Sequence, residues 1–135
     1  MSDKPFFDTN ILIYAVSEGD ARADIARALL AQGGVVSVHV LNEFVAAARR
    51  KLKMSWDEVR AALASLLVLC PKPMPITTEM HELAVKIAER YGYEIYDSLV
   101  IAAALQATSH SLYSEDLHTG HKIQGLTIRN PFRSS

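Results

Sequence analysis

The sequence has a single cysteine, Cys70, among its 135 residues, so it cannot form an internal disulfide. It also lacks a long hydrophobic run. The longest nearly apolar segment, residues 61–70, is about half of the roughly 20 residues that cross a bilayer. The first residues, MSDKPFFDTN, have no basic stretch followed by the apolar core of a secretory signal. These absences predict a protein of the reducing, cytoplasmic compartment that does not bind membranes.

An excess of charge of either sign is missing as well. Fourteen Lys and Arg residues against fifteen Asp and Glu residues give a formal net charge of -1. The whole chain therefore generates no positive field that would draw it onto nucleic acid, and a polyanion must bind a local basic patch. Half of the residues are apolar, and a chain of this length buries one hydrophobic core. We expect a single domain over residues 1–135.

Short apolar segments rich in β-formers separate stretches with helical spacing. The predicted strands are residues 6–7, 35–38, 74–77, 111–116 and 126–132. After the second of these strands, the helix-forming composition from Leu41 onward predicts a helix. Strands that alternate with helices predict an α/β fold with a mainly parallel sheet and helices on both of its faces.

Helical spacing also predicts which side chains face the core. A helix that begins near Asp20 is expected to bury Ile25, Ala28 and Leu29. Residues 55–58 match a capping box. The apolar stripe of the helix that follows this box is expected to comprise Trp56, Val59, Leu63, Leu66 and Leu67. The segment DSLVIAAALQA is apolar on nearly every side, which predicts a helix in the interior of the fold.

Four acidic residues stand near the ends of these elements. Asp8 follows the first strand, and Glu43 lies in the first turn after the second. Asp97 opens the apolar helix, and Asp116 follows the segment LYS. Because the carboxyl ends of parallel strands share one edge of a sheet, these carboxylates are expected to converge on one cleft.

Ionised carboxylates that crowd together raise one another's pKa unless a divalent cation neutralises them. An all-oxygen ligand set suits Mg²⁺ or Mn²⁺, and the chain has no zinc-type spacing of His and Cys. Each acid also has a purely structural interpretation: Asp97, for example, suits a helix N-cap. Glu115 beside Asp116 is an equally acidic rival, so the sequence leaves open which of the two faces a metal.

Four segments, taken in order, resemble the PIN-domain nucleases, and specifically the VapC-type toxins of bacterial toxin–antitoxin pairs. They are FFDTNILIYA, LNEFV, YDSLVIAAAL and LYSEDLHTG, and the tail GLTIRNPF is similar to the ending of one VapC subgroup. The resemblance implies a three-layer α/β/α sandwich and an endoribonuclease that depends on Mg²⁺ or Mn²⁺. It further implies a homodimer and inhibition by a small VapB-like antitoxin.

By position, the resemblance assigns metal binding and catalysis to four acids, with two polar residues in support. The acids are Asp8, Glu43, Asp97 and Asp116, and the supporting residues are Asn10 and Ser114. The family often has threonine where this chain has Ser114, so the hydroxyl group is retained. RNA is the expected substrate. The densest basic stretch offers Arg49, Arg50, Lys51 and Lys53 for its phosphates. Basic residues at the end of a helix also complement the helix dipole, and that role stays open.

Two other functions stay open at the level of sequence. The segment FFDTN is similar to the strand-end motif of haloacid-dehalogenase-type phosphatases, which use an aspartyl nucleophile. That motif requires an acid two residues after Asp8, where this chain has Asn10. The other alternative is a catalytically inactive module that binds only RNA or a partner protein, although the presence of all four acids favours the enzyme.

Overall fold

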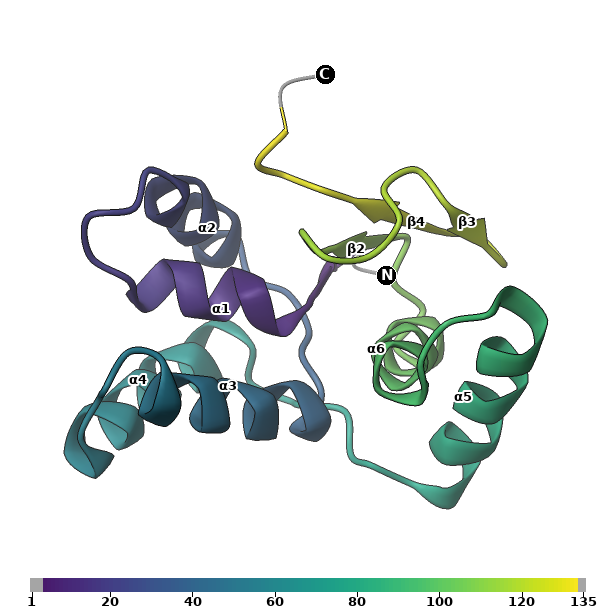
Figure 1. Cartoon of the computed structure of the whole chain (residues 1–135), viewed down its shortest axis with the longest axis horizontal. Coiled ribbons are helices and arrows are strands. Elements are labelled where there is room, and N and C mark those ends of the chain that lie inside the picture. Colours follow the sequence, from purple (N-terminus) through teal and green to yellow (C-terminus); the bar gives the residue numbers. More distant parts are fainter. Residues whose placement is uncertain (1–3, 134–135) are drawn as a thin grey trace.

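The computed structural model describes residues 4–133. In that range a short strand precedes six helices, and three further strands complete one sheet near the carboxyl terminus (Figure 1). The elements are β1 (Phe6–Phe7), α1 (Thr9–Val16), α2 (Arg22–Ala31), α3 (Val38–Arg50), α4 (Trp56–Leu69), α5 (Thr78–Tyr91), α6 (Ile95–Gln106), β2 (Ser111–Tyr113), β3 (Lys122–Ile123) and β4 (Leu126–Arg129). Within residues 4–133, no helix is both long enough and apolar enough to span a bilayer.

The sheet is mainly parallel, as the sequence predicts. Its strand order is β1-β2-β4-β3, in which β1 and β2 pair parallel, β2 and β4 pair parallel, and β3 pairs antiparallel with β4. Phe6 and Phe7 point to opposite faces of the sheet, and both are fully buried. Both faces are therefore covered at β1, which is the arrangement of an α/β fold with helices on each side.

The strands predicted at residues 35–38 and 74–77 are present only as single bridges, Phe6 with Val35 and Ser37 with Met74. Ser37 ends the extended segment because its hydroxyl accepts a hydrogen bond from the amide of Val40 and so caps α3. The helix therefore begins at Val38 rather than at Leu41, and Glu43 lies in its second turn instead of the first.

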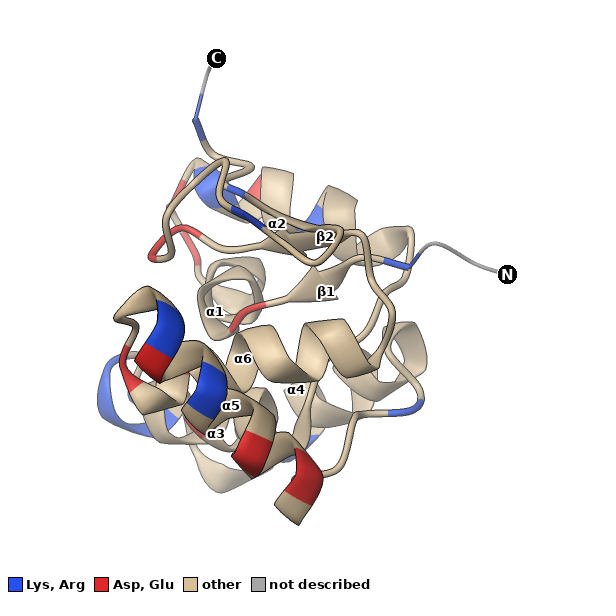
Figure 2. Ribbon diagram, turned by 90° about the vertical axis from the view of Figure 1, so that its right-hand side faces the viewer, with Lys and Arg blue, Asp and Glu red and all other residues tan. Residues whose placement is uncertain are grey.

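The helices pack in a connected series around the sheet. α1 packs against α2 and α3, α3 packs against α4 and α6, and α5 packs against α6. α6 lies below the strands in both Figure 1 and Figure 2. Its side chains from Val100 to Ala104 are buried, so the prediction of an interior helix is confirmed.

The predicted buried face of α2 is wrong. Ala23, Ala26 and Leu30 are buried, whereas Ile25 is 41% exposed. α2 packs against α1 through its small alanine side chains. This contact turns the bulkier Ile25 toward solvent, although its size favours burial.

The predicted stripe of α4 is partly wrong. Val59 and Leu66 are buried as expected, but Trp56 and Leu67 are exposed. The capping box is confirmed, because Ser55 and Glu58 exchange side-chain and backbone hydrogen bonds. Trp56 lies in the first turn of α4, and the guanidinium group of Arg49 covers its ring from outside the core.

Candidate active site

Asp8 lies where β1 ends and α1 begins. It is the N-cap of α1, and its Oδ1 accepts a hydrogen bond of 2.7 Å from the amide of Thr9. Its own amide donates to the carbonyl of Tyr113, the last residue of β2. The carboxyl ends of these two parallel strands therefore bring Asp8 next to Ser114, in keeping with the topology expected from the sequence.

Ser114 and Asn10 connect Asp8 with Asp116. The buried hydroxyl of Ser114 donates a hydrogen bond of 2.7 Å to Oδ2 of Asp8. Oγ of Ser114 in turn accepts from the amide of Asp116 at 3.2 Å and from Nδ2 of Asn10 at 3.4 Å. Nδ2 of Asn10 also lies 3.2 Å from Oδ2 of Asp116. The two polar residues singled out from the sequence thus hold two of the acids in one network.

Two residues outside the predicted site lie against Glu43. The hydroxyl of Thr9 donates to Oε1 of Glu43 at 2.9 Å, and Nε2 of His39 lies 3.4 Å from the same oxygen. His39 precedes Glu43 by one helical turn and is 8% exposed, and within the described residues its Nε2 has no hydrogen-bond partner. Their positions in the sequence could have indicated both residues, because Thr9 follows Asp8 directly and His39 stands four residues before Glu43.

Glu115 and Asp116 have different surroundings. The carboxylate of Glu115 accepts a hydrogen bond from the hydroxyl of Tyr14 and forms a salt bridge of 3.0 Å with Arg22. Burial and the bond to Glu115 raise the pKa of Tyr14 to about 12. Asp116 instead accepts from the neutral amide of Asn10. The negative charge of Glu115 is therefore compensated by a guanidinium group, while that of Asp116 contributes to the field around Asp8.

The four acids predicted from the sequence line one cavity of about 470 Å³. Asp8 reaches it from the start of α1, Glu43 from α3, Asp97 from the first turn of α6, and Asp116 from the loop after β2. In Figure 2, the acidic segment at the end of β1 lies between the labels of α1 and α6. Within residues 4–133, no three His, Cys, Asp or Glu side chains stand close enough together to hold a metal ion as they are placed. The carboxylates share a cavity and its electrostatic field, not one coordination point.

Two of these carboxyl groups have raised pKa values. Burial raises the pKa of Asp8 from 3.8 to about 6, and the charges of Glu43 and Asp116 add to the rise, while its hydrogen bonds oppose it. Burial also raises the pKa of Asp97, with further contributions from Glu94, Glu43 and Asp116. Ionisation of each of these carboxyl groups therefore costs free energy, and a nearby cation would lower that cost.

The basic stretch predicted to bind RNA divides into two pairs. Arg50 and Lys51 line the acidic cavity. Arg49 instead donates to the carbonyl of Met54 at 2.8 Å, and its guanidinium group lies 4.5 Å from the centre of the Trp56 ring. Lys53 is exposed and does not line the cavity. Two of the four predicted cations are thus placed to meet a phosphate at the acids.

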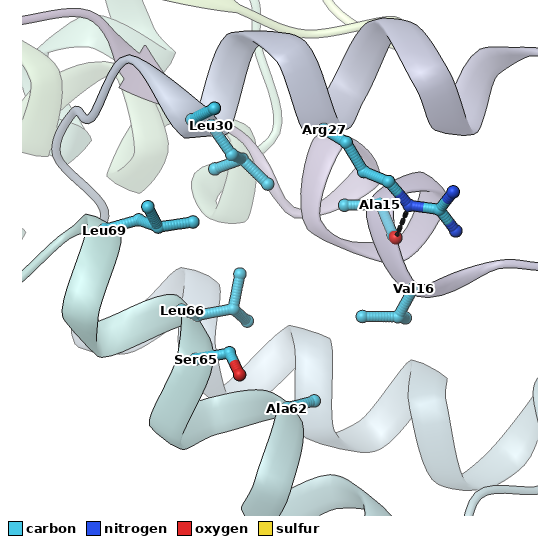
Figure 3. Close-up of a pocket in the computed structure, with 9 residues that line it drawn as sticks. Ala15, Val16, Arg27, Leu30, Ala62, Ser65, Leu66 and Leu69 are labelled. Atoms are coloured by element: carbon cyan, nitrogen blue, oxygen red, sulfur yellow. Dashed lines mark hydrogen bonds between the residues drawn. The ribbon is translucent and has the colours of Figure 1, made fainter.

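A second cavity, of about 350 Å³, lies between α1, α2 and α4 (Figure 3). Its lining is mainly aliphatic and includes Val16, Leu30, Leu66 and Leu69. Arg27, at its edge, donates from Nε to the carbonyl of Ala15 at 2.7 Å. Among the described residues, no carboxylate or histidine lines this cavity, so it lacks the groups that acid–base or metal chemistry requires.

A sequence model of the PIN domain matches residues 6–118. No curated protein sequence matches the chain. Several solved structures share the fold. VapC20 of Mycobacterium tuberculosis, described as a sarcin–ricin loop cleaving toxin, is 23% identical over 83% of this chain and 91% of its own, with a TM-score of 0.68.

A toxin–antitoxin complex from Klebsiella pneumoniae is 20% identical over 96% of this chain and 99% of its own, with a TM-score of 0.72. VapBC2 from Rickettsia felis, bound to a DNA fragment from its promoter, is 18% identical over 93% of this chain and 97% of its own, with a TM-score of 0.65. At these identities the likeness establishes the common fold.

Proposed function

Because the chain belongs to the PIN-domain family, we propose that it is a metal-dependent endoribonuclease and the toxin of a toxin–antitoxin pair. One observation carries the proposal: the four predicted acids, together with Glu115, come from four separate segments to line a single cavity. The hydroxyl and amide groups of Thr9, Asn10 and Ser114 orient three of them. The similar structures include a toxin that cleaves the sarcin–ricin loop, a toxin–antitoxin complex and VapBC2 on promoter DNA, which supports the toxin assignment.

The metal we propose is Mg²⁺, with Mn²⁺ as a substitute, held by the four cavity acids Asp8, Glu43, Asp97 and Asp116. The donor set fits such an ion, because carboxylate oxygens are the ligands that hard divalent cations prefer. The raised pKa values of Asp8 and Asp97 also fit: burial is their main cause, and the charges of Glu43 and Asp116 add to it. When bound, the ion would supply Lewis-acid activation of the phosphate and a hydroxide nucleophile at neutral pH.

The protein's own groups prepare this chemistry. Ser114 and Asn10 fix the separation of Asp8 and Asp116, and Thr9 keeps one oxygen of Glu43 occupied so that the carboxylate cannot rotate freely. Arg50 and Lys51, at the wall of the same cavity, attract the phosphates of RNA to an otherwise acidic surface. We propose a hydrolysis that needs no covalent enzyme intermediate and leaves a 3′-hydroxyl and a 5′-phosphate.

The direct test is cleavage of single-stranded RNA by the purified chain with Mg²⁺ and with EDTA. We expect cleavage only with the metal, and loss of cleavage in Asp97→Asn. The matched control is Asp24→Asn, which removes an acid whose side chain is 93% exposed on α2. Cleavage in EDTA, or undiminished cleavage by Asp97→Asn, would refute the assignment. Binding without cleavage by the wild type would favour the inactive module instead.

We propose an antitoxin as the regulatory partner. An arginine of the partner that entered the cavity would pair with the carboxylates and exclude both metal and RNA. Induction of the wild-type chain in a bacterial host should arrest growth, and induction of Asp97→Asn should not. Sequencing the 5′ ends of RNA after a brief induction would then identify the substrate. The proposed homodimer is tested by sedimentation of the purified chain.

A further inference from the structure

Tyr96 is an aromatic residue that the core does not explain. It lies in the first turn of α6, a helix whose central residues are buried, yet it is 63% exposed. Its neighbour in sequence, Asp97, lines the acidic cavity. A large apolar ring left open to water beside a charged cavity is a surface that a ligand with a flat apolar face can cover.

One face of this ring is already occupied. The imidazole of His39 stacks on Tyr96 with ring centroids 5.7 Å apart and an angle of 8° between the planes. The exposed area of Tyr96 is therefore on its other face and its edges. His39 is 8% exposed, and its Nε2 lies 3.4 Å from Oε1 of Glu43. The Tyr96 ring is thus one side chain away from an acid of the cavity.

The same contacts place the ring beside the acids, because the imidazole that stacks on Tyr96 also lies 3.4 Å from Glu43. A single strand of RNA whose phosphate enters the cavity carries a base on each side of that phosphate. Aromatic rings are the surfaces on which proteins stack unpaired bases, and a stack that begins with His39 and Tyr96 can be continued by one more ring.

We infer that Tyr96 is a stacking site for an unpaired nucleobase next to the phosphate received by the acidic cavity, with His39 as the residue that positions its ring. This inference rests on the proposed nuclease function and adds a subsite to it. It assigns recognition to a flat aromatic surface, which binds bases with little sequence preference. It also implies that single-stranded or looped RNA is preferred over a continuous duplex, whose bases are stacked on one another.

The test uses a single-stranded RNA that contains 2-aminopurine, whose fluorescence is quenched when it stacks. Binding is measured in EDTA, where metal-dependent cleavage does not proceed. Tyr96→Leu should weaken binding roughly 5- to 100-fold and abolish the quenching, whereas Tyr96→Phe, which keeps the ring, should stay within about twofold of the wild type. Circular dichroism confirms that each variant is folded.

The matched control is Trp56→Leu, because Trp56 is 52% exposed but lies beyond the end of α3 with Arg49 over its ring. It should bind RNA like the wild type. If Tyr96→Leu binds and quenches like a wild type that cleaves RNA with Mg²⁺, the stacking inference is wrong and the nuclease stands. If Tyr96→Leu instead loses self-association in sedimentation and binds RNA normally, the ring belongs to an interface between copies of the chain, which also overturns the inference. A wild type that neither binds nor cleaves RNA refutes the proposed function itself.

Discussion

The substitution Asp8→Asn should make the metal-free protein more stable at neutral pH, although it removes a residue proposed to be essential. Asp8 is buried, and burial raises the pKa of its carboxyl group from 3.8 to about 6. A group whose pKa is raised on folding stabilises the protein when protonated. That stability is present below about pH 4 and is lost as the pH rises through about 6.

The size of the effect follows from the shift. Each pKa unit corresponds to about 1.4 kcal/mol, so the rise from 3.8 to about 6 makes ionised Asp8 cost about 3 kcal/mol of unfolding free energy at pH 8. Asparagine is nearly isosteric with a protonated aspartate and offers one oxygen acceptor and one donor in the same place. We therefore expect the variant to match the wild type near pH 4 and to exceed its stability by about 3 kcal/mol at pH 8.

The assay is urea unfolding in EDTA, followed by circular dichroism, at a series of pH values from 4 to 8. The quantity to compare is the difference in unfolding free energy between Asp8→Asn and the wild type at each pH. Asp24→Asn, on the exposed side of α2, is the control and should show a small difference that does not change with pH. A difference for Asp8→Asn that stays constant over this range would show that Asp8 ionises freely, and the electrostatic description of the cavity would be wrong.

Addition of Mg²⁺ at pH 8 provides an independent check. A ligand that binds only the folded state stabilises it by about 2.7 kcal/mol at a concentration 100 times its dissociation constant. The wild type should gain this stability and Asp8→Asn should gain much less. Saturating metal should therefore reduce or reverse the difference in unfolding free energy between the two proteins. Equal stabilisation of both proteins would exclude Asp8 from the metal ligands.

Three further predictions concern the surroundings of the acids. Ser114→Ala removes the hydroxyl that bridges Asp8 and Asn10, so it should lower the free energy of unfolding in urea by about 1–3 kcal/mol and remove much of the cleavage. Ser114→Thr keeps a hydroxyl and should restore cleavage. Equal activity of the two variants would contradict the bridging role. Glu115→Gln should keep cleavage and Asp116→Asn should lose it, because Arg22 compensates the charge of Glu115; the reverse result in an RNA-cleavage assay would exchange their roles. Arg50→Ala should weaken RNA binding and reduce the slope of binding affinity against salt concentration by about one ion. Arg49→Ala should leave this slope unchanged, since its side chain is engaged with Trp56. Anisotropy titrations at several salt concentrations measure both slopes, and equal slopes for the two variants would contradict the prediction.

The contrast between Glu115 and Asp116 shows how one site uses acids for two purposes. Glu115 fastens the loop after β2 to α1 and α2 through Tyr14 and Arg22. This attachment fixes the neighbouring backbone, from which Asp116 reaches the cavity. Ionised Asp8 costs stability in the metal-free protein, and such a cost is typical of sites shaped for a ligand rather than for the fold.

The sequence by itself determined those features that depend on short-range interactions. The capping box at Ser55 and Glu58 was readable, because a cap needs only the backbone groups of one helical turn. The place of Asp8 was readable too, since an acid that directly follows a buried strand lies at the edge of the sheet.

Only the tertiary structure decided where long side chains and helix faces find their partners. Ile25 is exposed because α2 packs against α1 through small residues, a choice that the spacing within α2 does not contain. Likewise Arg49 turns to Trp56 while Arg50 lines the cavity, and His39 meets Tyr96 from another helix. These outcomes depend on contacts between distant segments, whose geometry is set by the packing of the whole core and not by any local pattern.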